Sequence, residues 1–171
     1  MQARLKKADA DVKWVSPANI HLTLKFLGEI DDKIKEAAVD IMADAAGAAH
    51  AFNIKLGGIG AFPSVQSPRV IWIGLALGHE EAKSIVLRLE DEFEKCGLPK
   101  ESRAFSSHIT LGRVLSRKNT DQLKNIMLEI ERSSAGSLQE FKTEKITLFK
   151  STLTPKGPIY EVIQETSLKT A

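Results

Sequence analysis

The sequence predicts an α+β fold built from two similar sheet-and-helix lobes that flank a central cleft. Segments with the 3.6-residue periodicity of amphipathic helices alternate with short segments in which apolar and polar residues alternate. A weak internal duplication points the same way, because the unit His-x-Thr occurs twice and each copy is followed by a helical segment. We therefore treat residues 1–171 as a single bilobal domain.

Three segments have helical periodicity. The second helix is expected over residues 79–96 and the third over residues 120–132, where Thr120 and Asp121 suit a helix N-terminus. The first is expected over residues 32–48, with apolar residues at i, i+3, i+4, i+7, i+8 and i+11: Ile34, Ala37, Ala38, Ile41, Met42 and Ala45.

The segments between and around these helices predict strands, several of them with period-two alternation and most bounded by Gly, Pro or Ser. The expected strands are residues 12–15, 21–27, 51–58, 69–76, 107–114, 138–149 and 159–165. The glycine-rich stretch "GGIGAF", residues 57–62, lacks the full G-x-G-x-x-G spacing and leads into a proline, so we interpret it as a strand end and not as a phosphate-binding loop.

The composition is that of an ordinary globular protein, with 43% hydrophobic residues and a formal net charge of +2. This charge permits an anionic ligand without requiring one. The single cysteine, Cys96, excludes an intramolecular disulfide and any zinc site made of several cysteines. The longest apolar run, residues 70–77, is far shorter than the roughly 20 residues that span a bilayer, so we expect a cytoplasmic protein that does not enter membranes.

Two short segments carry the residues of chemical interest. In "HLTLKFLGEI", residues 21–30, alternation places His21, Thr23 and Lys25 on one face of a strand. In "HITLGR", residues 108–113, it places His108 and Thr110 on one face. A lone strand histidine is usually structural, but a repeated His-x-Thr unit favours a functional pair that opens onto one cleft.

Two facing imidazoles suit the hydrolysis of a phosphodiester. Imidazole titrates near neutral pH, so one ring can accept a proton from water while the other delivers a proton to the departing oxygen. The hydroxyls of Thr23 and Thr110 can donate hydrogen bonds to non-bridging phosphate oxygens. This scheme requires no metal and no cofactor.

Arg113 is a candidate phosphate clamp, because a guanidinium donates two parallel hydrogen bonds to a phosphate. Strict alternation, however, places Arg113 with Ile109 and Leu111, away from His108. From spacing alone, Arg113 reaches the site only if the strand ends or bulges near Gly112, and a surface arginine is the alternative.

Several other residues are left out of the predicted site. His50 and His79 lie at a helix exit and a helix entrance, outside any His-x-Thr unit, and we expect them at the surface. For Trp72 we expect core packing and for Arg69 a solvated position, and Phe62 is likewise not included.

The segments "HLTLKFLGEI" and "SHITLGR" resemble the two-histidine phosphoesterases, specifically the RNA 2′,3′-cyclic phosphodiesterases that are also called 2′-5′ RNA ligases. The resemblance extends through "VKWVSPANIHLTLKFLGE", "FPSVQSPRVIW" and "ITLFKSTLTPKGPIYEVI", and so covers nearly the whole chain. It implies two pseudo-symmetric antiparallel sheets with packed helices around a central cleft.

The resemblance also implies an activity and roles for individual residues. The expected reaction is hydrolysis of an RNA terminal 2′,3′-cyclic phosphate to a 2′-phosphate, with weak 2′-5′ joining. His21 and His108 match the catalytic histidines, Thr23 and Thr110 the phosphate-contacting threonines, and Arg113 the phosphate-clamping arginine. We assign the acid role to His21 and the base role to His108; the reverse assignment is the alternative.

Family members usually begin with an apolar strand and a full first helix, whereas this chain begins at "MQARLKKADADVKW". We expect a monomer, and the lack of that first strand predicts an exposed sheet edge, reduced stability or strand exchange with a second copy. The expected substrates are RNA ends or nucleoside 2′,3′-cyclic phosphates. The alternatives are a non-catalytic nucleotide-binding module on the same fold and, less favoured, a metal-dependent hydrolase that uses both histidines as ligands.

Overall fold

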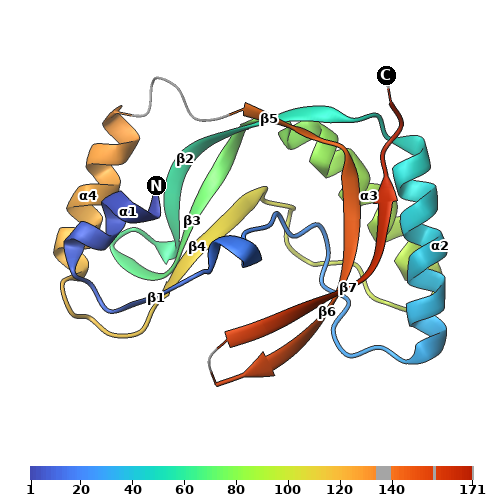
Figure 1. Cartoon of the computed structure of the whole chain (residues 1–171), viewed down its shortest axis with the longest axis horizontal. Coiled ribbons are helices and arrows are strands. Elements are labelled where there is room, and N and C mark those ends of the chain that lie inside the picture. The colour runs from blue at the N-terminus through green and yellow to red at the C-terminus, as the bar shows by residue number, and fades with distance from the viewer. Residues whose placement is uncertain (134–139, 156, 171) are drawn as a thin grey trace. The chain divides into compact units, whose positions relative to one another are not determined.

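A computed structural model of the chain describes residues 1–133, 140–155 and 157–170 (Figure 1). The chain divides into two compact units. Unit 1 comprises Met1–Thr23, Ile54–Leu77 and Ser106–Glu140, and unit 2 comprises Leu24–Asn53, Gly78–Phe105 and Phe141–Ala171. In the described part of the chain, no helix is both long and apolar enough to cross a membrane.

The elements are those of an α+β protein, as predicted. The helices are α1 (Gln2–Leu5), α2 (Asp32–Ala48), α3 (His79–Lys95) and α4 (Thr120–Ser133), with 3-10 turns η1 (Lys6–Ala8) and η2 (Pro17–Asn19). The strands are β1 (Val12–Trp14), β2 (Phe52–Ser64), β3 (Ser67–Leu77), β4 (His108–Val114), β5 (Glu140–Thr143), β6 (Lys145–Thr154) and β7 (Gly157–Ser167). They form one sheet in the order β1-β4-β3-β2-β5 and a second sheet of β6 and β7.

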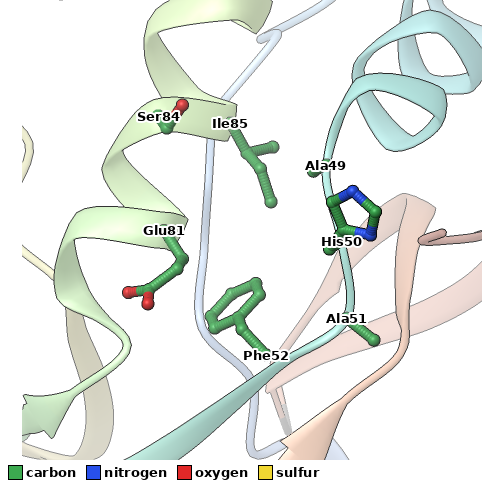
Figure 2. Close-up of a pocket in the computed structure, with 7 residues that line it drawn as sticks. All are labelled: Ala49, His50, Ala51, Phe52, Glu81, Ser84 and Ile85. Carbon is green, nitrogen blue, oxygen red and sulfur yellow. The ribbon is translucent and has the colours of Figure 1, made fainter. Parts of the chain in front are cut away.

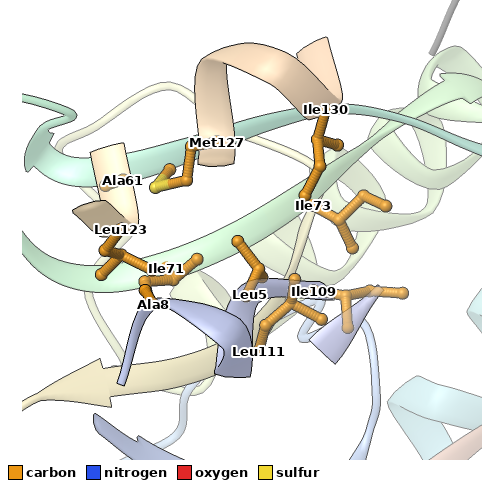
Figure 3. Close-up of a cluster of buried hydrophobic side chains, with 10 residues drawn as sticks. All are labelled: Leu5, Ala8, Ala61, Ile71, Ile73, Ile109, Leu111, Leu123, Met127 and Ile130. Carbon is orange, nitrogen blue, oxygen red and sulfur yellow. The ribbon is translucent and has the colours of Figure 1, made fainter. Parts of the chain in front are cut away.

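Unit 1 is held together by one apolar cluster on one face of its sheet (Figure 3). Helix α4 contributes Leu123, Met127 and Ile130 to this cluster, all at most 1% exposed, and α1 adds the fully buried Leu5. Each such side chain stabilises the fold by about 1.5–3 kcal/mol through burial. The sheet contributes the remaining large side chains of this cluster: Ile71, Ile73, Ile109 and Leu111.

Unit 2 contains a second apolar cluster, formed mainly by α2 and α3. Helix α2 begins where the Asp31 carboxylate accepts a 2.8 Å hydrogen bond from the backbone N–H of Ile34, as an N-cap should. Helix α3 ends before Gly97, whose φ of +88° supplies the left-handed residue that commonly terminates helices. The β6–β7 hairpin belongs to the same unit, and its Ile146 contacts the cluster.

The three predicted helices are confirmed to within one residue at each end. The predicted strand at residues 21–27 is wrong, because only Leu22 makes a β-bridge and the chain passes from unit 1 to unit 2 after Thr23. The predicted strand at 138–149 corresponds to β5 and β6, and its first two residues lie outside the described part of the chain. Cys96 lies at the C-cap of α3.

Lys25 leaves the face that alternation assigned to it and forms an ion pair inside unit 2. Its ammonium lies 2.6 Å from the Glu90 carboxylate, and the two side chains are only 7% and 11% exposed. Glu90 also accepts a hydrogen bond from the backbone N–H of Glu101. The pair therefore anchors the chain two residues after Thr23.

Replacing Lys25 by methionine is expected to lower the free energy of unfolding by about 3 kcal/mol, because it leaves the Glu90 carboxylate buried without its counter-ion. Lys95→Met is the matched control, since Lys95 makes a 2.7 Å ion pair with Glu92 while 68% exposed and should lose less than about 1 kcal/mol. Urea denaturation measures both. Equal losses, or no recovery when Glu90→Gln is added to Lys25→Met, would contradict this account.

Candidate active site

The face of the unit 1 sheet opposite its apolar cluster carries three of the predicted site residues. Ile71 and Ile73 of β3 point into the cluster, so the residues that alternate with them point to the other face. Directly opposed residues of antiparallel strands share a face. On this second face the β3–β4 pairs are Gly74 with His108, Trp72 with Thr110, and Val70 with Arg113.

A β-bulge in β4 brings Arg113 to this face. The β3–β4 register shifts between Ile71 and Trp72, so that one extra residue of β4, at Leu111, is accommodated there. Without this shift Arg113 would share the face of Ile109, as strict alternation required. The strand therefore bulges near Gly112, which is the condition under which alternation allowed Arg113 to reach this face. Lys13 pairs with Arg113 across β1 and β4 and adds a second cation on the same face.

The first His-x-Thr segment lies beside the second, along the edge of β4. An antiparallel bridge joins Leu22 to Ile109. Its register places His21 opposite Thr110 and Thr23 opposite His108, with side chains on the same face. The duplication suggested that the two histidines come from two lobes; in the structure both belong to unit 1. The arrangement arises because β1 leaves the edge of β4 after Trp14 and the chain returns to that edge at Leu22.

Both histidines have the same hydrogen bond on Nδ1. The Nδ1 of His21 lies 2.8 Å from the carbonyl oxygen of Asn19, and the Nδ1 of His108 lies 2.7 Å from that of Ser106. A carbonyl oxygen only accepts, so each Nδ1 carries a proton and donates it. In each neutral ring Nε2 is then the basic nitrogen, which is the atom that can accept or, once protonated, deliver a proton.

Two aromatic side chains lie against the ring of His108. The Phe62 ring is 5.1 Å from it at an interplanar angle of 84°, and the Trp72 ring is 6.2 Å away at 62°. Phe62 and Trp72 also contact each other at 5.4 Å. The expectation of core packing for Trp72 is wrong, because Trp72 lies half-buried on the face opposite the cluster. The alternation of "VIWIG" around the buried Ile71 and Ile73 was the signal that could have placed it there.

The stretch "GGIGAF" is explained by packing. A Cβ added to Gly60 would lie 2.2 Å from the Trp72 ring, and one added to Gly57 would lie 2.6 Å from the Cβ of Ala76. The glycines therefore let side chains of β3 lie flat on β2. The stretch therefore lies inside β2, and the predicted strand end at residues 57–62 is wrong because β2 continues to Ser64.

Gly60→Ala is expected to destabilise the protein by about 1–3 kcal/mol, because the new methyl group displaces Trp72. Gly47→Ala is the matched control: Gly47 lies in α2 with no atom within 4 Å of the added Cβ, and it should stabilise by about 0.5–1 kcal/mol through helix propensity. Thermal unfolding of both variants measures the difference. A stabilising Gly60→Ala would show that Trp72 does not occupy this position.

The other two histidines lie in unit 2. His79 is the first residue of α3 and stacks on Phe105 at 6.2 Å. His50 is exposed, as predicted, and lines a pocket of about 370 Å³ together with Ala49, Ala51, Phe52, Glu81, Ser84 and Ile85 (Figure 2). None of the predicted site residues lines this pocket. Within residues 1–133, 140–155 and 157–170, no three His, Cys, Asp or Glu side chains gather as metal ligands would.

Comparison with known proteins assigns the chain to a family. Residues 1–72 and 77–160 match the family described as LigT like phosphoesterase. A protein of Methanothermobacter thermautotrophicus named RNA 2′,3′-cyclic phosphodiesterase is 35% identical over 160 residues, which cover 94% of this chain and 84% of that protein. A protein of the same name from Methanocaldococcus jannaschii is 39% identical over 156 residues, covering 90% of this chain and 83% of that protein.

Solved structures support the fold. A crystal structure of a Thermus thermophilus protein matches with a TM-score of 0.76 and 25% identity, covering 98% of this chain and 90% of that one. The crystal structure of E. coli LigT complexed with 3′-AMP matches with a TM-score of 0.67 and 22% identity, covering 92% of this chain and 82% of that one.

Proposed function

Because the chain belongs to the LigT-like phosphoesterase family, we propose that it hydrolyses terminal RNA 2′,3′-cyclic phosphates to 2′-phosphates with two histidines and no metal. The observation that carries this proposal is the pair of His-x-Thr segments in antiparallel register, with Nδ1 of each ring bound to a backbone carbonyl. The names of the relatives support the choice of substrate.

In the proposed step, water attacks phosphorus and a new P–O bond forms while the bond from phosphorus to the 3′-oxygen breaks. Nε2 of His108 accepts the proton of the attacking water. Nε2 of His21, protonated at the start, delivers its proton to the departing 3′-oxygen. The phosphate then stays on the 2′-oxygen, and each ring contributes about 10²- to 10⁴-fold to the rate.

The negative charge that grows on the non-bridging oxygens is met by donors on the same face of the sheet. In an antiparallel register through the Leu22–Ile109 bridge, each threonine lies opposite the other segment's histidine. In the proposed step each hydroxyl donates to an oxygen of a phosphate held between the two rings. Arg113, brought to this face by the bulge, supplies a bidentate cation. The charge is thereby stabilised most in the transition state.

We propose that the same residues also support weak 2′-5′ joining. If the 5′-hydroxyl of a second RNA replaces water, the same P–O3′ bond breaks and a 2′-5′ linkage forms. The acid and base roles are unchanged.

The proposal is tested by phosphorus NMR on a nucleoside 2′,3′-cyclic phosphate and on an RNA oligonucleotide with a 3′-terminal cyclic phosphate, both in excess chelator. We expect complete conversion to the 2′-phosphate. Activity that disappears in chelator would contradict the metal-free mechanism. Binding of the nucleotide without turnover would support a non-catalytic binding module instead.

A further inference from the structure

We infer that Phe62 and Trp72 are positioning residues that fix the ring plane of His108, so that its Nε2 faces the attacking water. The inference rests on the proposed function for its kinetic consequence. Its structural content, the order of one imidazole ring, can be measured without any substrate.

The contacts around His108 restrict its ring from separate directions. The hydrogen bond from Nδ1 to the Ser106 carbonyl fixes one edge of the ring. A single hydrogen bond leaves the ring able to tilt about the donor–acceptor line. Phe62 at 84° and Trp72 at 62° both meet the imidazole in edge-type geometry, and such contacts between aromatic rings favour one relative orientation. Together the three contacts specify the ring plane.

Trp72 is itself held by packing. Its six-membered ring lies over Gly60, where a Cβ would approach to 2.2 Å, and close to Gly74, where a Cβ would lie 3.6 Å from it. Its indole Nε1–H is buried and donates to no acceptor in the described part of the chain. Substituting Trp72 by phenylalanine therefore removes ring area without breaking a hydrogen bond, which makes it a clean probe of packing.

Substitution of Phe62 tests the contact with His108 at a smaller cost in stability. Its side chain is 38% exposed, so its removal should leave the apolar cluster intact. Phe62→Leu removes the edge-type contact with His108, and Phe62→Tyr retains the ring. Phe141→Leu is the matched control, because Phe141 is 42% exposed and makes no ring contact within the described residues.

The first readout is the protonation of the two ring nitrogens, observed by nitrogen-15 NMR of histidine-labelled protein without substrate at a pH where the ring is neutral. We expect wild type and Phe141→Leu to show the Nδ1–H tautomer of His108 with one set of signals. Phe62→Leu and Trp72→Phe should shift or broaden these signals, because the ring then tilts while its Nδ1–H bond to Ser106 persists, and Phe62→Tyr should keep the wild-type signals. A His108 spectrum unchanged in Phe62→Leu and Trp72→Phe would overturn the inference.

The second readout is kinetic. Phe62→Leu should lower kcat about 10- to 100-fold with little change in KM, since misplacement by about 1 Å can cost that much. A rise in KM with kcat unchanged would assign the ring to substrate binding and contradict the inference. If wild type shows no turnover, the proposed function fails, and the NMR comparison alone decides whether the aromatic pair orders His108.

Discussion

His21→Ala and His108→Ala are each expected to reduce kcat for cyclic-phosphate hydrolysis by about 10²- to 10⁴-fold, because each removes one of the two proposed proton transfers. The loss should appear in kcat, because the proposed mechanism assigns phosphate binding to Thr23, Thr110 and Arg113 and not to the two rings. The measurement is the initial rate of 2′-phosphate formation at saturating substrate, in excess chelator.

The two remaining histidines provide the controls. His50→Ala and His79→Ala remove the same side chain from unit 2 and should leave kcat near the wild-type value. The double variant of His21 and His108 should be little worse than the worse single variant, because groups that act in one step are not additive. A full-rate His21→Ala or His108→Ala would remove that ring from the mechanism.

Arg113→Leu is expected to lower kcat by about 10²- to 10³-fold, comparable to the loss of a donor that stabilises transition-state charge. The reason is the bulge at Leu111, which puts Arg113 on the sheet face of His108 and Thr110. Arg113→Lys should recover only part of the loss, because an ammonium cannot make two parallel hydrogen bonds to one phosphate.

Arg117→Leu is the charge-matched control. It removes an exposed arginine four residues along the same unit and should change kcat little. If kcat falls equally in Arg113→Leu and Arg117→Leu, the effect of Arg113→Leu comes from the change in net charge and not from a contact with the phosphate. If neither loses activity, the assignment of Arg113 to the phosphate is wrong.

The helices and the faces of the site strand were predictable because they depend on local periodicity. Ile109 and Leu111 alternate with His108 and Thr110, and the structure buries the first pair while leaving the second pair half-buried. Such a pattern needs no knowledge of the neighbouring strand.

The bulge could not be predicted, because it depends on which residue of β4 is left without its own partner on β3. Gly112 permits the close packing there, since a Cβ would lie 2.7 Å from Val12 and 3.0 Å from Trp14. Both contacts come from β1, about a hundred residues earlier in the chain. The local sequence pattern therefore predicted only that Arg113 reaches the site if β4 bulges or ends near Gly112.

The segment after His21 was predicted as a strand because its apolar and polar residues alternate. In the structure only Leu22 of this segment forms a β-bridge, and Lys25 forms an ion pair with Glu90 of unit 2. Glu90 lies 65 residues further along the chain, and its burial beside Lys25 is a tertiary feature. This non-local pairing overrides the local alternation.

The most direct test of the two-histidine mechanism is the pH dependence of kcat/KM in excess chelator for wild type, His21→Ala and His108→Ala. An acid and a base that act together predict a rate that passes through a maximum in wild type. The plot of kcat/KM against pH for the residual activity of His108→Ala should lack the part that rises with pH. The same plot for His21→Ala should lack the part that falls with pH. If both variants keep the wild-type profile, the rings do not act as the acid and base, and the central claim fails.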